Sequence, residues 1–283
     1  MIARRLELPL AVAAGVIVRV PFWAEALRTP LDGDAAIIGL MARHPFAGAT
    51  MWGQPYGSPL EAWLAAPLFA VGRPDAATLR LVYFVLGLAL IPAAYALARA
   101  LDARAALPAA LLVACPPPYL LLLSALPPPM YPSALLLGAA VLLLAMAIGR
   151  ALSRGAPARA RLALWGVLSG LALWTHLMSA AAVAAGGWWI ARRARGRWTS
   201  AWPAVAGLAL SSAPWWTRAL ADPQALQVVN VSGRREGLLD HLAEVLPRLH
   251  EPMGGLLGTH VPLVADDATH VVEAPALAAV MVV

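Results

Sequence analysis

The chain has 283 residues, of which 61% are hydrophobic and 13% are charged, and its mean hydropathy is +0.71. Because a soluble domain carries about 25% charged residues, this composition excludes a water-soluble globular enzyme and indicates a polytopic membrane protein. Long Leu, Ala and Val runs without period-2 alternation favour membrane helices over a closed barrel. We therefore expect an all-α fold, a polytopic transmembrane helix bundle.

The first hydrophobic segment, residues 6–23, is long enough to span a membrane. A cleaved signal peptide is the rival interpretation. We disfavour it because no A-x-A cleavage site precedes Pro21 and because Arg19 interrupts the apolar run. We expect Arg19 to extend toward the outer membrane interface and place its charge in water there.

The loop that follows, residues 24–75, is predicted to contain two short amphipathic surface helices. Asp34 stands where a helix would begin, and Asp is a favoured N-cap. An apolar face at helical spacing follows, and Pro45 ends the run. Residues 48–58 are rich in Gly and Pro and predict turns. Residues 60–71 predict a second apolar helix, also too short to span, so we expect both helices to lie on the membrane surface.

The rest of the chain predicts further spans, about seven in all. Residues 76–98 and 133–148 span, whereas residues 105–126 are broken by Pro116 and the two prolines after it. Residues 162–190 predict a hairpin that turns near Trp174, Thr175 and His176. Residues 202–216 predict the next crossing, with Trp215 as part of an aromatic belt. We divide the chain into a membrane module at 1–216, an outer loop at 217–270, and a truncated helix that begins at 271–283.

The placement of the arginines predicts the orientation of the bundle. All 21 basic residues are arginines, and the sequence pI is about 10.4. With the N-terminus in the cytoplasm, only Glu7 and Asp102 among the acids share the inner side with the short basic loops. This distribution argues against a nucleic-acid partner, which needs one basic face with stacking aromatics, and predicts attraction of the inner face to anionic lipid. The inner arginines are Arg4, Arg5, Arg99, Arg104, Arg150, Arg154, Arg159, Arg161, Arg192, Arg193, Arg195 and Arg197.

Residues 32–80 carry a set of short motifs. They are Asp34-Ala35-Ala36, Gly39-Leu40-Met41-Ala42-Arg43, Gly53-Gln54-x-Tyr56-Gly57-Ser58-x-Leu60-Glu61-Ala62, Ala65-Ala66-Pro67-Leu68-Phe69 and Leu79-Arg80-Leu81. The set resembles the GT-C glycosyltransferases, in particular bacterial relatives of the protein O-mannosyltransferases and aminoarabinose transferases. These polytopic enzymes take sugars from polyprenyl-phosphate donors on the outer face, and two surface helices in the first outer loop are one of their features. Beyond residue 80 the resemblance is architectural.

The resemblance implies an inverting sugar transfer to an acceptor hydroxyl. That hydroxyl needs a general base, and by its position in the motif Asp34 is the expected catalytic base; the same residue could be a plain helix N-cap. Many relatives have Glu after this Asp, and the position is Ala35 here. Asp32 could substitute for that Glu, because Asp-Gly-Asp places two carboxylates close together.

The leaving phosphate needs cationic or hydrogen-bonding partners, and four residues are candidates: Arg43, His44, His176 and Arg218. Each has a structural alternative, as a surface anchor for the arginines and as a satisfied structural histidine for His176. Gln54, Tyr56 and Glu61 are expected to hold sugar hydroxyls or to shape the loop. Gly53 and Gly57 are expected to permit tight turns.

No cofactor is required by these motifs. A divalent metal is a weaker hypothesis, because the histidines of the outer loop lack a known ligand spacing. The residues in question are His241, His250, His260, His270, Asp266 and Asp267.

The expected partners are a polyprenyl-phosphate sugar donor, membrane lipids and an acceptor protein, polysaccharide or lipid. Two other functions stay open. Broken helices are also typical of a transporter or flippase of a lipid-linked substrate. Ala35 in place of the glutamate would fit an inactive paralogue.

Overall fold

The computed structural model describes residues 2–54, 57–117, 121, 129–194, 201–221, 261–263 and 270–272. Three of its helices are long and apolar enough to cross a membrane: α1 (Ile2–Ala26), α4 (Ala76–Leu101) and α7 (Tyr131–Ser153). These three correspond to predicted spans, so the helical, membrane-spanning character is confirmed at this level. The remaining helices are shorter, and the count of about seven spans stays a prediction.

Helix α5 (Ala106–Ala114) is much shorter than the predicted segment 105–126. It ends just before Pro116, and its terminal carbonyls have no partners within the helix. The guanidinium of Arg19 supplies them, with Nη1 donating to Ala114 O at 2.7 Å and Nη2 donating to Val113 O at 2.6 Å. Arg19 is only 3% exposed, so the prediction that it extends to the membrane interface is wrong. It stabilises the end of a broken helix instead.

The two predicted short helices are present in the first loop as α2 (Gly33–Arg43) and α3 (Leu60–Val71). Helix α2 begins two residues earlier than expected, because Asp32 and not Asp34 is its N-cap. The Asp32 side chain accepts from Ala35 N at 2.7 Å. The two helices pack on each other and on α4 through one hydrophobic cluster. Its largest fully buried members include Ile38, Met51 and Tyr83.

The predicted hairpin over residues 162–190 is formed by α8 (Arg159–Thr175), the short helix η1 (Leu177–Ser179) and α9 (Ala180–Ala194). Both helices pack on α7, and α8 also packs closely on α10 (Trp202–Ser211). Glycines permit that approach, since a Cβ on Gly166 would lie 2.0 Å from Ala204 O and one on Gly170 would lie 2.3 Å from Leu208 O. Small residues at helix contacts are typical of membrane bundles.

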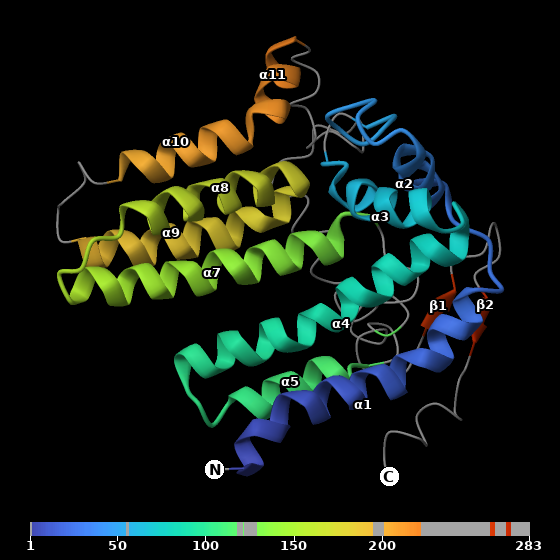
Figure 1. Ribbon diagram of the computed structural model, residues 1–283, viewed down its shortest axis with the longest axis horizontal. Helices are drawn as coiled ribbons and strands as arrows, with labels where there is room; N and C mark the ends of the chain where they lie inside the picture. Colours follow the sequence, from blue (N-terminus) through green and yellow to red (C-terminus); the bar gives the residue numbers. More distant parts are fainter. Residues whose placement is uncertain are drawn as a thin grey trace, which may run out of the picture.

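The segment predicted as one crossing, residues 202–216, is not one continuous helix. The chain bends at Ser212 and continues as a separate helix, α11 (Ala213–Ala221). Pro214 has no backbone N–H to continue the helical hydrogen bonds, and at the bend the Ser212 hydroxyl donates to Leu208 O at 2.7 Å. Figure 1 shows α11 turned away from the axis of α10.

Two short strands, β1 (Val261–Leu263) and β2 (His270–Val272), form an antiparallel pair within the predicted outer-loop region. Val271 and Val272, expected to begin a further helix, belong to β2 instead, and residues 273–283 lie outside the described part. Apart from this pair, the described elements are helical.

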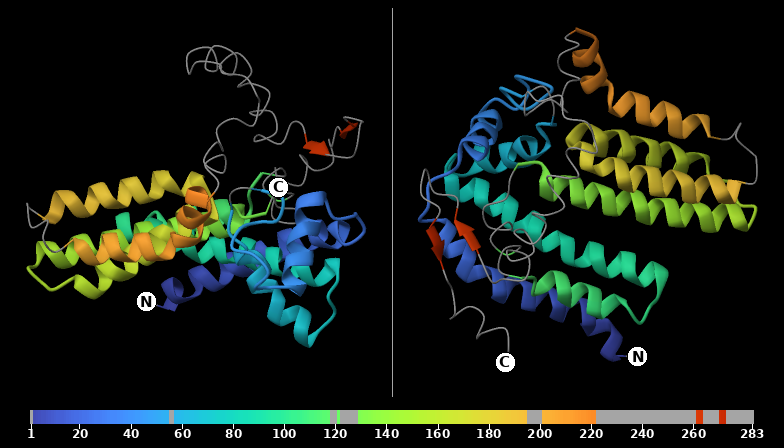
Figure 2. Two further views of the ribbon diagram at one scale, coloured as in Figure 1. Left: turned by 90° about the horizontal axis from the view of Figure 1, so that it is seen from above. Right: turned by 180° about the vertical axis from the view of Figure 1, so that it is seen from behind.

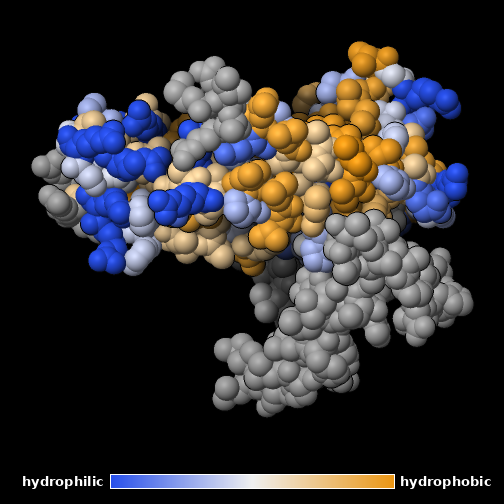
Figure 3. Space-filling view, turned by 90° about the horizontal axis from the view of Figure 1, so that it is seen from below, coloured by the Kyte–Doolittle hydropathy of each residue, from blue (hydrophilic) through white to orange (hydrophobic). Residues whose placement is uncertain are grey.

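The loops and the short helices lie at two opposite ends of the molecule. The α4–α5 and α7–α8 loops, the end of α9 and the start of α10 lie toward one end, and α2, α3, η1 and α11 lie toward the other (Figures 1 and 2). Figure 3 shows hydrophilic residues at the end that holds the α7–α8 loop, and an apolar surface over the middle of the molecule. We call the first region the basic end and the second the first-loop end.

Candidate functional site

The start of α2 presents the two predicted catalytic carboxylates at the surface of the first-loop end. Asp32 and Asp34 are both exposed. The Asp34 Oδ1 lies 3.5 Å from Nε2 of Gln54, which the next turn region supplies. The amide oxygen of Gln54, Oε1, is shielded and has no hydrogen-bond partner among the described residues. Three of the predicted site residues are therefore brought together here.

Ala35 stands where the resemblance predicts a glutamate, and it is a buried residue of α2. Its side chain is 6% exposed. A glutamate at this position would be buried, whereas Asp32 and Asp34 are exposed.

Arg80 holds the chain immediately before these carboxylates. Its guanidinium is buried and donates to Thr29 O at 2.6 Å and to Pro30 O at 3.0 Å. It also attracts the Asp32 carboxylate electrostatically. Sequence reasoning did not single out Arg80 as a site residue, although the Leu79-Arg80-Leu81 motif contained it.

Glu61, predicted to hold a sugar hydroxyl or to shape the loop, has the second role. It is 1% exposed, its Oε2 accepts from Met130 N at 2.7 Å, and its Oε1 accepts from the Ser133 hydroxyl at 2.6 Å. Burial raises the pKa of Glu61, and the hydrogen bonds from Met130, Ser133 and Tyr83 oppose that rise. We therefore remove Glu61 from the candidate site and assign it to the junction of α3 with α7.

That junction has a close approach that requires glycine. Gly57 has a φ of +85°, and a Cβ there would lie 2.0 Å from the Met130 sulfur. Met130 is itself left-handed, with a φ of 75°. Such a backbone costs energy for a residue with a side chain, and the bond from its N–H to Glu61 offsets part of that cost. The prediction of tight turns at Gly53 and Gly57 is confirmed, since both have positive φ.

A hollow of about 350 Å³ lies at the first-loop end, beside the turn that follows α2. We call it the first-loop hollow. Aromatic side chains dominate its wall, and Phe46 is 91% exposed at its edge. The hollow joins the turn after α2 with α3, the end of α8 and the start of α11. Its lining residues are Phe46, Ala47, Gly48, Ala49, Trp63, Trp174 and Pro214.

Two tryptophans fasten the first loop to the hairpin at this hollow. The Trp174 indole donates to Ala49 O at 2.9 Å, and the Trp63 indole donates to Pro45 O. The two rings meet edge to face with centroids 5.6 Å apart. Ser58 adds a buried hydroxyl contact of 3.0 Å with Thr175. These contacts make the turn region between α2 and α3 part of the folded core, and sequence reasoning recognised only the polar tip of the hairpin.

The predicted phosphate ligands of α2 lie at its C-terminal end. Arg43 is exposed and donates to Pro74 O at 2.8 Å. His44 is the C-cap residue of α2 and stacks on Trp52, with ring centroids 6.3 Å apart. Both residues have structural contacts that fit their alternative roles, and both remain accessible from the surface.

His176 lies between α8 and η1, and its Nδ1 accepts from Met178 N at 3.1 Å. Its ring packs on Tyr131 with centroids 4.8 Å apart. Burial lowers the pKa of His176, so the neutral imidazole, with its proton on Nε2, dominates at pH 7. In that form His176 brings no positive charge to the site. Arg218 lies one turn after Pro214 on α11 and is exposed.

Other predicted residues receive no structural support. Tyr56 lies outside the described residues, as do His241, His250, His260, Asp266 and Asp267, and of His270 only its place in β2 is described. Within the ranges that the structure describes, no group of three or more His, Cys, Asp or Glu residues could hold a metal ion.

The geometry therefore combines an exposed carboxylate pair, an accessible amide and an aromatic hollow at one end of a membrane protein. Comparisons with protein-family models, curated proteins and solved structures found no match to this chain.

Proposed function

We propose that this protein is a membrane glycosyltransferase that moves a sugar from a polyprenyl-phosphate donor to an acceptor hydroxyl. The observation that carries the proposal is the exposed position of Asp34 next to Gln54. A carboxylate that is neither buried nor ion-paired with a described residue is available to take a proton. The resemblance of residues 32–80 to the GT-C glycosyltransferases supplies the reaction class.

In this proposal Asp34 accepts the proton of the acceptor hydroxyl. The hydroxyl oxygen forms a bond to the anomeric carbon of the sugar from the side opposite the donor phosphate. The bond between the anomeric carbon and the phosphate oxygen breaks, and polyprenyl phosphate leaves with the electron pair. The sugar configuration is thereby inverted. Gln54 orients Asp34, and Asp32 fixes the start of α2 through its bond to Ala35 N.

The donor is proposed to bind along the first-loop hollow. The aromatic wall suits the isoprenoid chain next to the phosphate, because burial of that chain removes apolar surface from water. Arg43 and Arg218 are the proposed phosphate partners, since both are exposed and carry charge.

The location of the reaction follows from the arrangement of charges. The loops rich in arginine lie at the basic end, and Asp32 and Asp34 lie at the first-loop end. Because positive loops stay in the cytoplasm, we propose that the site faces outward from the cytoplasmic membrane, with the N-terminus inside. The acceptor is then an outer-face protein, polysaccharide or lipid.

The test is an assay for released polyprenyl phosphate in membranes that contain the full-length protein. Radiolabelled polyprenyl-phosphate sugars are the donors, and membranes without the protein are the control. The proposal requires release that is stoichiometric with sugar transfer. Movement of intact donor across the membrane without release would support a transporter, and neither event with any donor would support an inactive paralogue.

A further inference from the structure

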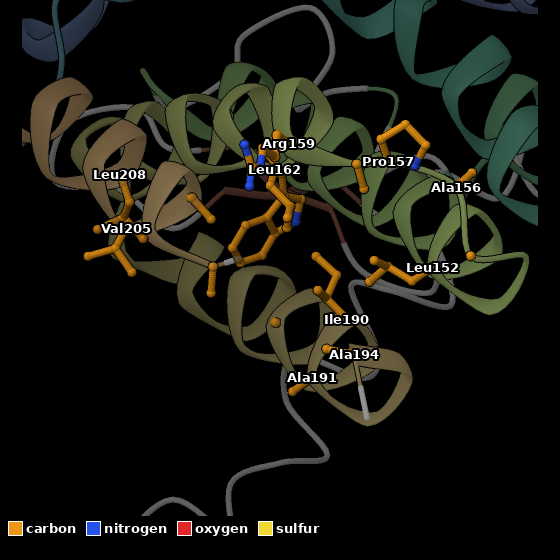
Figure 4. Close-up of a pocket in the computed structure, with 16 residues that line it drawn as sticks. Leu152, Ala156, Pro157, Arg159, Leu162, Ile190, Ala191, Ala194, Val205 and Leu208 are labelled. Atoms are coloured by element: carbon orange, nitrogen blue, oxygen red, sulfur yellow. The ribbon is translucent and has the colours of Figure 1, made fainter. Parts of the chain in front are cut away.

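A second cavity lies at the basic end, far from the first-loop hollow. It has a volume of about 350 Å³ and lies between α8, α9, α10 and the loop after α7. Figure 4 shows side chains from all four elements around it, with Arg159 and Leu162 from α8, Ile190 from α9 and Leu208 from α10. We call it the basic-end pocket. Trp165, the lining residue of α8 that lies closest to the hairpin tip, precedes Thr175 by ten residues, or about 15 Å.

Small residues of α9 leave this space open. Helix α9 packs mainly on α7, whereas α8 packs mainly on α7 and α10. Gly187, Ala191 and Ala194 form the α9 wall, where larger side chains would fill the pocket. A Cβ at Gly187 would meet the Trp165 ring at an ordinary distance of 3.5 Å. The pocket therefore exists because the α9 residues beside it are small. Its wall is mostly apolar.

Arg159 is the one charged residue among those that line the pocket. The sequence from 103 to 221 contains ten arginines and no Asp or Glu. Arg159 lines the pocket and is exposed. Neither ion pair found among the described residues involves any of these arginines. A ligand that complements this site is apolar along most of its length and anionic at one end.

A buried donor in the wall lacks an acceptor. Trp165 is 8% exposed, and its Nε1 is shielded from water with no hydrogen-bond partner in the described part of the chain. Because this atom is shielded and lies toward Gly186, which does not line the pocket, an occupant of the pocket contacts the edge of the indole ring and not its N–H.

We infer that the basic-end pocket binds one anionic phospholipid of the surrounding membrane. An acyl chain occupies the apolar pocket against the Trp165 ring, and the phosphate lies at Arg159. This inference goes beyond the proposed transferase function and does not depend on it, because it concerns the opposite end of the helices.

The test is native mass spectrometry of the full-length protein with equimolar phosphatidylglycerol and phosphatidylcholine. The wild type should retain one phosphatidylglycerol in preference to phosphatidylcholine. Arg159→Ala should lower that preference about five-fold, the effect of one arginine near an anionic lipid. Ala191→Phe should abolish retention of both lipids by filling the pocket.

Arg192→Ala is the matched control. Arg192 lies at the same basic end, but its guanidinium sits 5.0 Å from the Trp188 ring on another face of α9, outside the pocket. Thermal unfolding of each variant verifies that it folds. Equal retention of the two lipids by the wild type would overturn the inference, as would equal losses in Arg159→Ala and Arg192→Ala, which would indicate general attraction. Full retention by Ala191→Phe would also overturn it.

Discussion

The Arg80 guanidinium donates to the Thr29 carbonyl at 2.6 Å across 51 residues of sequence. This bond ties the start of α4 to the turn that precedes Asp32. Because Arg80 also bonds the Pro30 carbonyl and is buried, the position of the carboxylate pair depends on a residue outside the site. Several consequences of such supporting contacts can be measured.

Replacement of Arg80 by Ala should weaken both the fold and the proposed activity. Two carbonyls lose their donor, which we expect to lower the free energy of unfolding by about 1–3 kcal/mol. Transfer activity should fall as well, because the chain before Asp32 is released. Thermal unfolding and the transfer assay measure the two effects. Arg73→Ala is the control, since Arg73 is exposed and pairs only with Asp75 among the described residues; an equal effect of both changes would contradict the role of Arg80.

Glu61 should make the stability of the protein depend on pH. Its pKa is raised in the folded state, so the folded protein binds its proton more tightly than the unfolded chain. The associated stability is fully present below the ordinary carboxyl pKa, and it is lost as the pH rises through the raised folded value. Unfolding temperatures measured across that range should fall for the wild type, and the fall should be smaller for Glu61→Gln.

The alanine variant tests the hydrogen bonds of Glu61 separately. Glu61→Ala leaves the buried Met130 N–H and the Ser133 hydroxyl without their acceptor. We expect a loss of about 2–4 kcal/mol in the free energy of unfolding from these two groups. If the alanine and glutamine variants unfolded at the same temperature, the carboxylate oxygens would have no supporting role.

Gly57→Ala should be destabilising by about 1–3 kcal/mol, because φ is +85° and the new Cβ would clash with Met130. Gly33→Ala is the matched control at the start of α2. A Cβ at Gly33 meets nothing within 4 Å, and its φ is not positive. Chemical unfolding of both variants provides the comparison, and a Gly57 variant as stable as the Gly33 variant would show that the turn can relax.

Trp174→Phe should show whether the indole hydrogen bond holds the first loop in place, because the variant keeps an aromatic ring in the wall of the hollow. The variant keeps an aromatic ring against Trp63 but loses the bond to Ala49 O. We expect about 1 kcal/mol lower stability and weaker donor binding. A proteolysis assay of the turn region and donor titrations measure these effects. Unchanged susceptibility and affinity would show that the indole N–H does not hold the loop.

The parts of the fold that depend on local signals could be predicted from the sequence. The bounds of α3 follow from Pro59 before it and Gly72 after it, and both ends match the expectation. The predicted start of α2 was wrong by two residues because Asp-Gly-Asp offers two possible N-caps. In the structure Asp32 is the N-cap, and Ile38 packs in the cluster with α3 and α4.

The parts that depend on distant partners could not be predicted. Arg19 looks like an interfacial anchor in sequence, and its partners at residues 113 and 114 exist only because α5 ends there. Glu61 looks like a surface residue at a helix start, and only the approach of α7 makes it a buried acceptor. The exposed position of the carboxylate pair could be predicted, because acidic residues next to a membrane segment are costly to bury and this follows from the local sequence alone.

Transfer by Asp34→Asn tests the central claim most directly. The measurement compares sugar transfer from a radiolabelled polyprenyl-phosphate donor in membranes that contain wild type, Asp34→Asn or Asp75→Asn. Asp75 is the control because it is an aspartate at the start of the neighbouring helix α4, where it is the N-cap. We predict that Asp34→Asn loses about 10²–10⁴-fold in transfer, the usual contribution of a general base, while Asp75→Asn retains it. Full transfer by Asp34→Asn would contradict the account.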